Sequence, residues 1–197
     1  MTERGVLELL DNDGTKRMMP FSTDTRHSQP TSLRADLLLV AFLIGLVVAA
    51  RLLPHTPNVS PVVASALFAA MVLQRRSLAL LVPLGGMLIS NLMMGSDQWQ
   101  VTAVVYAALA WPVAIGFVAR RYRLSVAIVP AALSCSLLFF ATTNFAVWAF
   151  SGMYSLDMAG LVQCYVAALP FLKYTVTGDL LWTAVLFGGA WLLSRAS

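Results

Sequence analysis

The sequence has 197 residues, of which 59% are hydrophobic and only 11% are charged, whereas a soluble globular domain contains about 25% charged residues. This composition excludes an ordinary soluble domain, because the apolar residues exceed the need of a small core and fall in blocks, as bilayer-spanning helices do. The formal net charge of +4 does not indicate a nucleic-acid partner, because the basic residues separate apolar blocks instead of alternating with exposed aromatic residues. The sequence therefore predicts a polytopic protein of the lipid bilayer.

The first 33 residues are polar and mix Ser, Thr, Asp and Arg without a sustained apolar period. They lack the basic start, the apolar stretch and the cleavage site of a secretory signal peptide. We expect residues 1–33 to form a disordered cytoplasmic tail, in which only residues 5–10 have the composition of a helical turn. Residues 34–197 are expected to form the transmembrane domain.

The apolar segments after this tail predict an all-α membrane protein with six transmembrane helices. The expected spans are residues 36–53, 60–73, 78–94, 101–119, 124–141 and 175–193. The second is short enough to be re-entrant instead. Before the last span, residues 142–150 are apolar but interrupted by Asn144, and residues 151–158 have the composition of a loop. Residues 159–172 predict a short interfacial or re-entrant helix that ends at Pro170, with a seventh full span as the alternative.

The positions of the arginines favour six spans over seven. Lys and Arg are enriched in the short cytoplasmic loops of membrane proteins. A seventh span would place Arg195 on the outer side, whereas six spans keep the arginine groups other than Arg51 on the cytoplasmic side, together with both termini. These residues are Arg34, Arg75, Arg76, Arg120, Arg121, Arg123 and Arg195.

Under this topology, polar residues gather at the outer ends of the spans and predict a cavity that opens outward. A polar group inside a bilayer is costly and needs a partner or water. Structural roles are the alternatives: Arg51 can extend to lipid headgroups, and Asn91 can join two helices. The candidate substrate-binding residues are Arg51, His55, Asn58, Asn91, Asn144, Trp148, Tyr154, Tyr174 and Asp179. The five that we expect to converge on one cavity are Arg51, Asn91, Asn144, Trp148 and Asp179.

The sequence contains none of the motifs of common enzymes or metal sites. It has no HExxH, no GxSxG and no phosphate-binding loop. Two histidines and two cysteines do not suffice for a convincing metal site or a disulfide framework, and we expect Cys135 and Cys164 to be core residues. The sequence therefore predicts a protein without catalytic residues, metal or cofactor.

Four segments resemble an uncharacterised family of small bacterial membrane proteins. They are RLLPHTPNVSPVVASALFAA (residues 51–70), LALLVPLGGMLISNLMMG (residues 78–95), SLLFFATTNFAVWAFSGMY (residues 136–154) and GLVQCYVAALPFLKYTVTGDLLW (residues 160–182). The resemblance covers residues 34–193. In size, span number and the turn after the first helix, that family is similar to the S components of energy-coupling-factor (ECF) transporters, which bind vitamins.

This resemblance implies a six-helix, ECF S-component-like protein of the bacterial cytoplasmic membrane with both termini in the cytoplasm. Such a subunit binds a small molecule from outside and associates with a transmembrane coupling subunit and ATPase subunits. The resemblance also implies an aspartate where this sequence has Asn91. The alternative function is a structural or assembly subunit of a larger membrane complex, in which the outer polar residues join helices. A small membrane enzyme is a third hypothesis.

Overall fold

The computed structural model describes residues 8–10, 16–18, 33–53, 59–95 and 98–196. The chain divides into two units, residues 1–30 and residues 31–197. In the first unit, strands β1 (Glu8–Leu10) and β2 (Lys16–Met18) pair in antiparallel register, with Leu9 opposite Arg17. The expected helical turn is therefore wrong for residues 8–10. Leu33 begins the first helix. Apart from Leu33 and the two strands, residues 1–33 lie outside the described residues, and so does the expectation that they are disordered.

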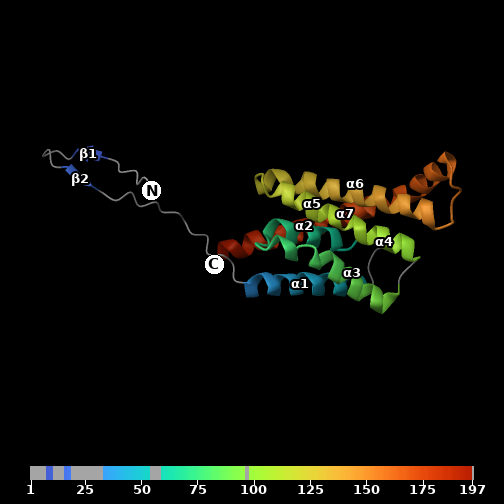
Figure 1. Cartoon of the computed structure of the whole chain (residues 1–197), viewed down its shortest axis with the longest axis horizontal. Coiled ribbons are helices and arrows are strands. Elements are labelled where there is room, and N and C mark those ends of the chain that lie inside the picture. Colours follow the sequence, from blue (N-terminus) through green and yellow to red (C-terminus); the bar gives the residue numbers. More distant parts are fainter. Residues whose placement is uncertain (1–7, 11–15, 19–32, 54–58, 96–97, 197) are drawn as a thin grey trace, which may run out of the picture. The chain divides into compact units, whose positions relative to one another are not determined.

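In the described part of the second unit, all regular secondary structure is helical (Figure 1). Five of its helical segments are long and apolar enough to cross a membrane, so the chain is a multi-pass membrane protein. The sixth segment is the short apolar helix α2. The helices are α1 (Leu33–Leu52), α2 (Val62–Val72), α3 (Leu81–Met94), α4 (Trp99–Ala108), α5 (Ala110–Ala119), α6 (Leu124–Phe150) and α7 (Met158–Ala196), with a short 3-10 turn at Arg76–Leu78.

Helix α2 lies at the centre of the bundle. All its residues from Val62 to Met71 are buried, and it packs against α5, α7, α3 and α6. Its 11 residues extend only about 16 Å, roughly half the thickness of a bilayer's hydrocarbon core. Its C-terminal end adjoins the beginning of α1, where the backbone N–H of Arg75 donates to Asp36 Oδ2 at 3.2 Å. The short helix therefore fills only the half of the bundle near the start of α1.

The fourth predicted span is divided into α4 and α5 at Leu109. Pro112 lies in the first turn of α5 and has no backbone N–H to donate to the carbonyl of Ala108. This missing hydrogen bond accounts for the break, and the two helices together still form one apolar segment of 21 residues.

The separate interfacial helix predicted at residues 159–172 is wrong, and so is the seventh-span alternative. These residues belong to one continuous helix, α7, which contains Pro170 in its interior. Residues 142–150 likewise continue α6. Helix α7 has 39 residues and is about 58 Å long, almost twice the hydrocarbon thickness of about 30 Å. The α6–α7 hairpin therefore extends beyond the span of a bilayer.

The loop of this hairpin is fixed by hydrogen bonds to the start of α7. The backbone N–H of Gly160 donates to Asp157 Oδ1 at 2.7 Å, and Ser155 Oγ donates to the same oxygen at 2.9 Å. Asp157 thus caps the first turn of α7, and these bonds, led by that from Gly160, lower the pKa of its carboxyl group. On the partner helix, Trp148 Nε1 donates to the carbonyl of Ser155 at 2.9 Å.

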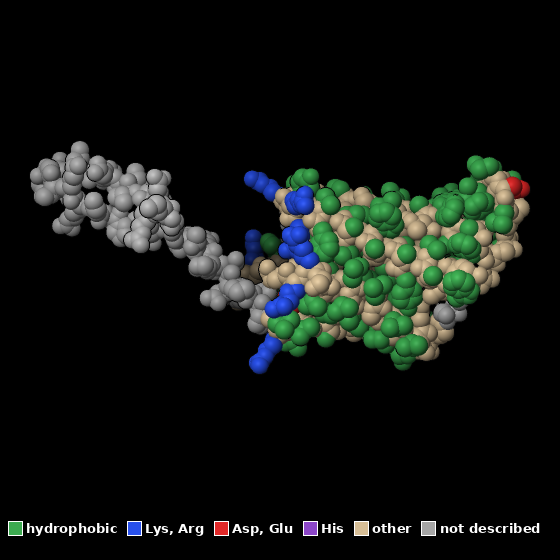
Figure 2. Space-filling model, in the orientation of Figure 1, with side chains coloured by type: hydrophobic (Ala, Val, Ile, Leu, Met, Phe, Trp, Pro, Cys, Tyr) green, Lys and Arg blue, Asp and Glu red, His purple; other side chains and the backbone are tan. Residues whose placement is uncertain are grey.

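Apart from Arg51, the arginines of the described helical unit gather at one end of the bundle (Figure 2). They flank the start of α1, the turn between α2 and α3, the turn between α5 and α6, and the end of α7. Arg120 Nη1 contributes to the packing there by donating to the carbonyls of Ala70 and Leu73, at 3.3 and 3.4 Å. This arrangement agrees with the prediction that these arginines lie on one side of the membrane domain. Cys135 and Cys164 are buried, as expected for core residues.

Candidate functional site

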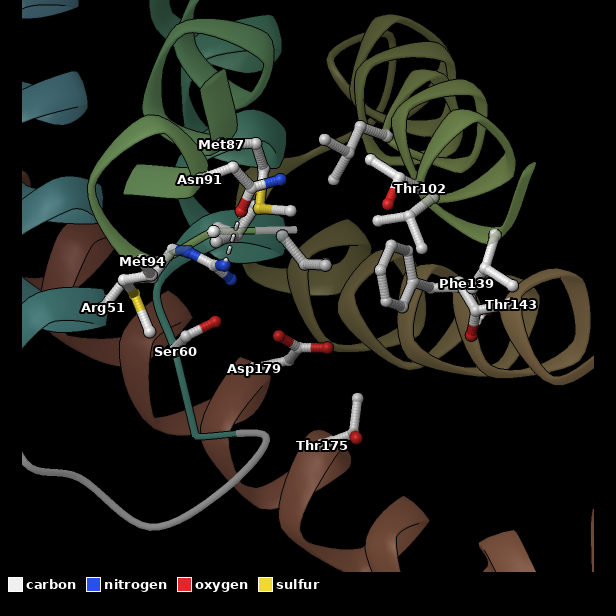
Figure 3. A pocket seen from close by; sticks show the side chains of 16 residues that line it. Arg51, Ser60, Met87, Asn91, Met94, Thr102, Phe139, Thr143, Thr175 and Asp179 are labelled. Atoms are coloured by element: carbon white, nitrogen blue, oxygen red, sulfur yellow. Dashed lines mark hydrogen bonds between the residues drawn. The ribbon is translucent and has the colours of Figure 1, made fainter. Parts of the chain in front are cut away.

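A cavity of about 610 Å³ lies in the half of the bundle that α2 does not fill. Its floor includes Val62 and Val63 at the start of α2, and its walls come from α1, α3, α4, α6 and α7 (Figure 3). Its volume is within the range of about 300–1,000 Å³ for small-molecule sites. The lining residues are Arg51, Ser60, Val62, Val63, Met87, Asn91, Met94, Gly95, Val101, Thr102, Val105, Leu109, Phe139, Thr143, Thr175 and Asp179.

Arg51, in the last turn of α1, is held in place by α3. Its Nε donates to Ser90 Oγ at 2.8 Å, and its Nη2 donates to Asn91 Oδ1 at 3.0 Å. Ser90 Oγ lies 2.8 Å from the carbonyl oxygen of Gly86 and donates its single proton along the helix. Both side chains that hold the guanidinium are neutral. The guanidinium is therefore fixed in orientation without its charge being neutralised by these partners.

Asn91 connects Arg51 to the wall formed by α4. Its Nδ2 lies 3.4 Å from the hydroxyl oxygen of Tyr106, to which it donates a long hydrogen bond. An amide can accept from one residue and donate to another at the same time, so Asn91 joins α1, α3 and α4. The sequence left two roles open for Asn91, a hydrogen bond between helices and contact with a substrate. In the structure Asn91 makes hydrogen bonds between helices and also lines the cavity.

Asp179 lines another wall of the cavity, and in Figure 3 its carboxylate points into the cavity. It belongs to α7 and is only 3% exposed. Ser136 of α6 donates to Asp179 Oδ2 at 2.6 Å. Among the described residues no ion pair joins Asp179 to Arg51, and no hydrogen bond reaches its other oxygen, Oδ1.

The other predicted residues lie elsewhere. Asn144 lines a second, smaller cavity of about 180 Å³, which shares Phe139, Thr143 and Thr175 with the first, and its Nδ2 donates to the carbonyl of Phe140. The structure does not bring the remaining described candidates to either cavity. Trp148 binds the hairpin loop, Tyr174 is 40% exposed beside Lys173, and Tyr154 lies in that loop. His55 and Asn58 are outside the described residues.

Several residues that line the cavity or support its lining were not predicted. Ser90, Tyr106 and Ser136 supply the hydrogen bonds that position Arg51, Asn91 and Asp179, and Thr102, Thr143 and Thr175 add hydroxyl groups to the wall. Each lies within an apolar helix without a motif, so their only sequence clue is a hydroxyl at membrane depth. The described residues contain no group of three His, Cys, Asp or Glu side chains placed to bind a metal ion. The lining of the cavity offers hydrogen-bonding groups, two charged side chains and apolar contact.

These features define a class: a multi-pass α-helical membrane protein with a polar cavity in the half of its bundle remote from the arginine end. The chain belongs to the family of unknown function DUF6580, whose defining sequence pattern matches residues 31–197. No curated protein and no solved structure gave a significant match to the chain. The family assignment covers the whole helical unit and brings no activity with it.

Proposed function

We propose that the protein is the substrate-binding membrane subunit of a small-molecule uptake system. The observation that carries the proposal is the cavity of about 610 Å³ between membrane-spanning helices, into which Arg51 and Asp179 both project. Ionisable groups inside membrane domains are expensive and typically mark substrate or ion sites. In this proposal the protein catalyses no reaction, and its partners supply the energy.

The proposed orientation places the arginine end of the bundle in the bacterial cytoplasm. Positively charged residues favour the cytoplasmic side, and the start of α1 and the end of α7 both lie at that end (Figure 1). The cavity then lies on the outer side, where an uptake system meets its substrate. This orientation matches that of ECF S components, and the proposal extends their mode of action, with a coupling subunit and ATPases, to this chain.

We expect reporter fusions at residue 1 and after residue 197 both to report the cytoplasm. Five long apolar segments and the short helix α2 make six segments in the described part of the helical unit, and an even number of crossings returns the chain to its starting side. A fusion in the loop after Phe150 serves as the control and should report the outside. Opposite locations for the two termini would contradict the proposed orientation.

The binding role can be tested with a matched pair of threonines on α7. Thr175 lines the cavity, whereas Thr177 is exposed, and each donates its hydroxyl to the carbonyl four residues earlier. We expect Thr175→Val to lower the amount of small molecule that co-purifies with the protein from its own membrane, by roughly two- to tenfold for one lost hydrogen bond. Thr177→Val should change it little. Native mass spectrometry measures both.

The same purification distinguishes the two function classes. A co-purifying coupling subunit with ATPases supports uptake. Wild-type protein that carries no small molecule, and that purifies instead within a large assembly without ATPases, would contradict the proposal in favour of a structural or assembly subunit.

A further inference from the structure

We propose that the cavity binds an amphoteric small molecule, with a carboxylate or similar anionic group at Arg51 and an ammonium or other N–H donor at Asp179. This inference rests on the proposed binding function and specifies the chemical class of the ligand. Two walls of the cavity carry the inference, because Arg51 on one and Asp179 on the other have hydrogen-bonding groups without partners among the described residues.

The first wall offers an oriented cation. The bonds to Ser90 and Asn91 use Nε–H and one N–H of Nη2, so three of the five N–H groups of a guanidinium have no partner among the described residues. The remaining edge, between Nη1 and Nη2, has the geometry that binds a carboxylate through two parallel hydrogen bonds. Because Asn91 is neutral, this positive charge is available to a ligand.

The second wall offers Asp179, a carboxyl group that can accept hydrogen bonds. Ser136 occupies Oδ2 of Asp179, whereas Oδ1 accepts no hydrogen bond from the described part of the chain. Asp179 is 3% exposed, and a buried carboxyl without sufficient donors is costly. A ligand N–H or ammonium group can supply the missing donor at this position.

The surface between the two walls suits the body of such a molecule. Met87 and Phe139 provide apolar and aromatic contact, and Thr102, Thr143 and Thr175 provide hydroxyl groups (Figure 3). A purely anionic ligand would leave Asp179 without a donor, and a purely cationic ligand would leave Arg51 without an anion. Arg51 and Asp179 together therefore favour a molecule that carries both groups.

The test uses full-length protein in lipid nanodiscs and a defined equimolar mixture of two matched sets of compounds. One set is ω-aminohexanoate, hexanoate and hexylamine, and the other is para-aminomethylbenzoate, para-toluate and para-methylbenzylamine. After the unbound compounds are removed, mass spectrometry quantifies what the protein retains. We expect at least one amino acid to be retained roughly tenfold or more above the acid and the amine of the same skeleton, since each charged hydrogen bond is worth about 1.5–3 kcal/mol.

Two isosteric variants assign the groups. Asn91→Asp places a carboxylate against Arg51 and should lower retention of the amino acid roughly tenfold or more by neutralising the cation. Asp179→Asn should shift retention toward the acid without the amine. Gln98→Glu and Asp157→Asn make the same chemical changes at positions that do not line the cavity and should leave retention unchanged.

Three results would overturn the inference: equal retention of an amino acid and its single-charge analogues, retention of none of the six compounds, or equal effects of the site and control variants. The proposed function is judged separately, by whether wild-type protein from its own membrane carries any small molecule. A captured compound without an anionic group or without an N–H donor would overturn this inference while leaving the binding function in place.

Discussion

Replacing Asp179 by leucine is expected to raise the thermal stability of the ligand-free protein while abolishing its capture of small molecules. Asp179 is 3% exposed and has one hydrogen-bond donor, Ser136, in the described part of the chain. An apolar side chain avoids the cost of burying a carboxyl group with too few hydrogen-bond partners, which is about 1–3 kcal/mol. Ser136 keeps an acceptor, because its hydroxyl lies 3.1 Å from the carbonyl of Ala132.

The measurement is the midpoint of thermal unfolding in detergent, combined with native mass spectrometry of bound compounds. Asp179→Asn is the matched control, because it keeps the shape and the polarity of the side chain and should shift the midpoint less. A lower midpoint for Asp179→Leu would show that Asp179 stabilises helix packing. That result would favour the structural or assembly role over the binding role.

Replacing Gly116 by alanine is expected to destabilise the bundle by about 1–3 kcal/mol through overpacking. Gly116 of α5 faces α2, and an added Cβ would lie 2.6 Å from the Cβ of Ala70 and 3.1 Å from the carbonyl oxygen of Leu67. Neither a backbone carbonyl nor a Cβ can move away without shifting the buried helix α2. A fall of several degrees in the midpoint of thermal unfolding is the expected result.

Gly188→Ala provides the control for this prediction. An added Cβ at Gly188, on α7, meets no atom within 4 Å, and alanine favours a helix over glycine by about 1 kcal/mol. We therefore expect an unchanged or slightly higher midpoint. Equal midpoints for the two variants would show that α2 and α5 are not packed as closely as described.

The helical segments could largely be predicted, because each span is a mainly apolar block and arginines mark one of its ends. The sequence did not predict that α6 and α7 are each one continuous helix. Asn144 interrupts the apolar pattern of the sequence, but its side chain donates to the carbonyl of Phe140 within the same helix at 2.8 Å, so the helix satisfies this amide without breaking. Pro170 removes one hydrogen bond, yet α7 continues through it against α6.

The sequence predicts the depth of a polar residue in the membrane, and the candidate site could be predicted only to that extent. Arg51, Asn91 and Asp179 share a depth and line one cavity. The sequence predicts Trp148 on the same cavity. Because α6 continues to Phe150, Trp148 instead lies near the hairpin loop and donates to the carbonyl of Ser155. Tyr106 and Ser136 come from helices whose rotation about their axes is set by packing, which a single apolar sequence does not specify.

The size of the cavity follows from the length of one helix. Because the first turn of α2 forms its floor, each residue added to that turn would raise the floor by about 1.5 Å while the surrounding helices kept their positions. The volume of the cavity and the arrangement of the surrounding helices can thus change independently. A longer or shorter α2 would therefore give a smaller or larger cavity between the same surrounding helices.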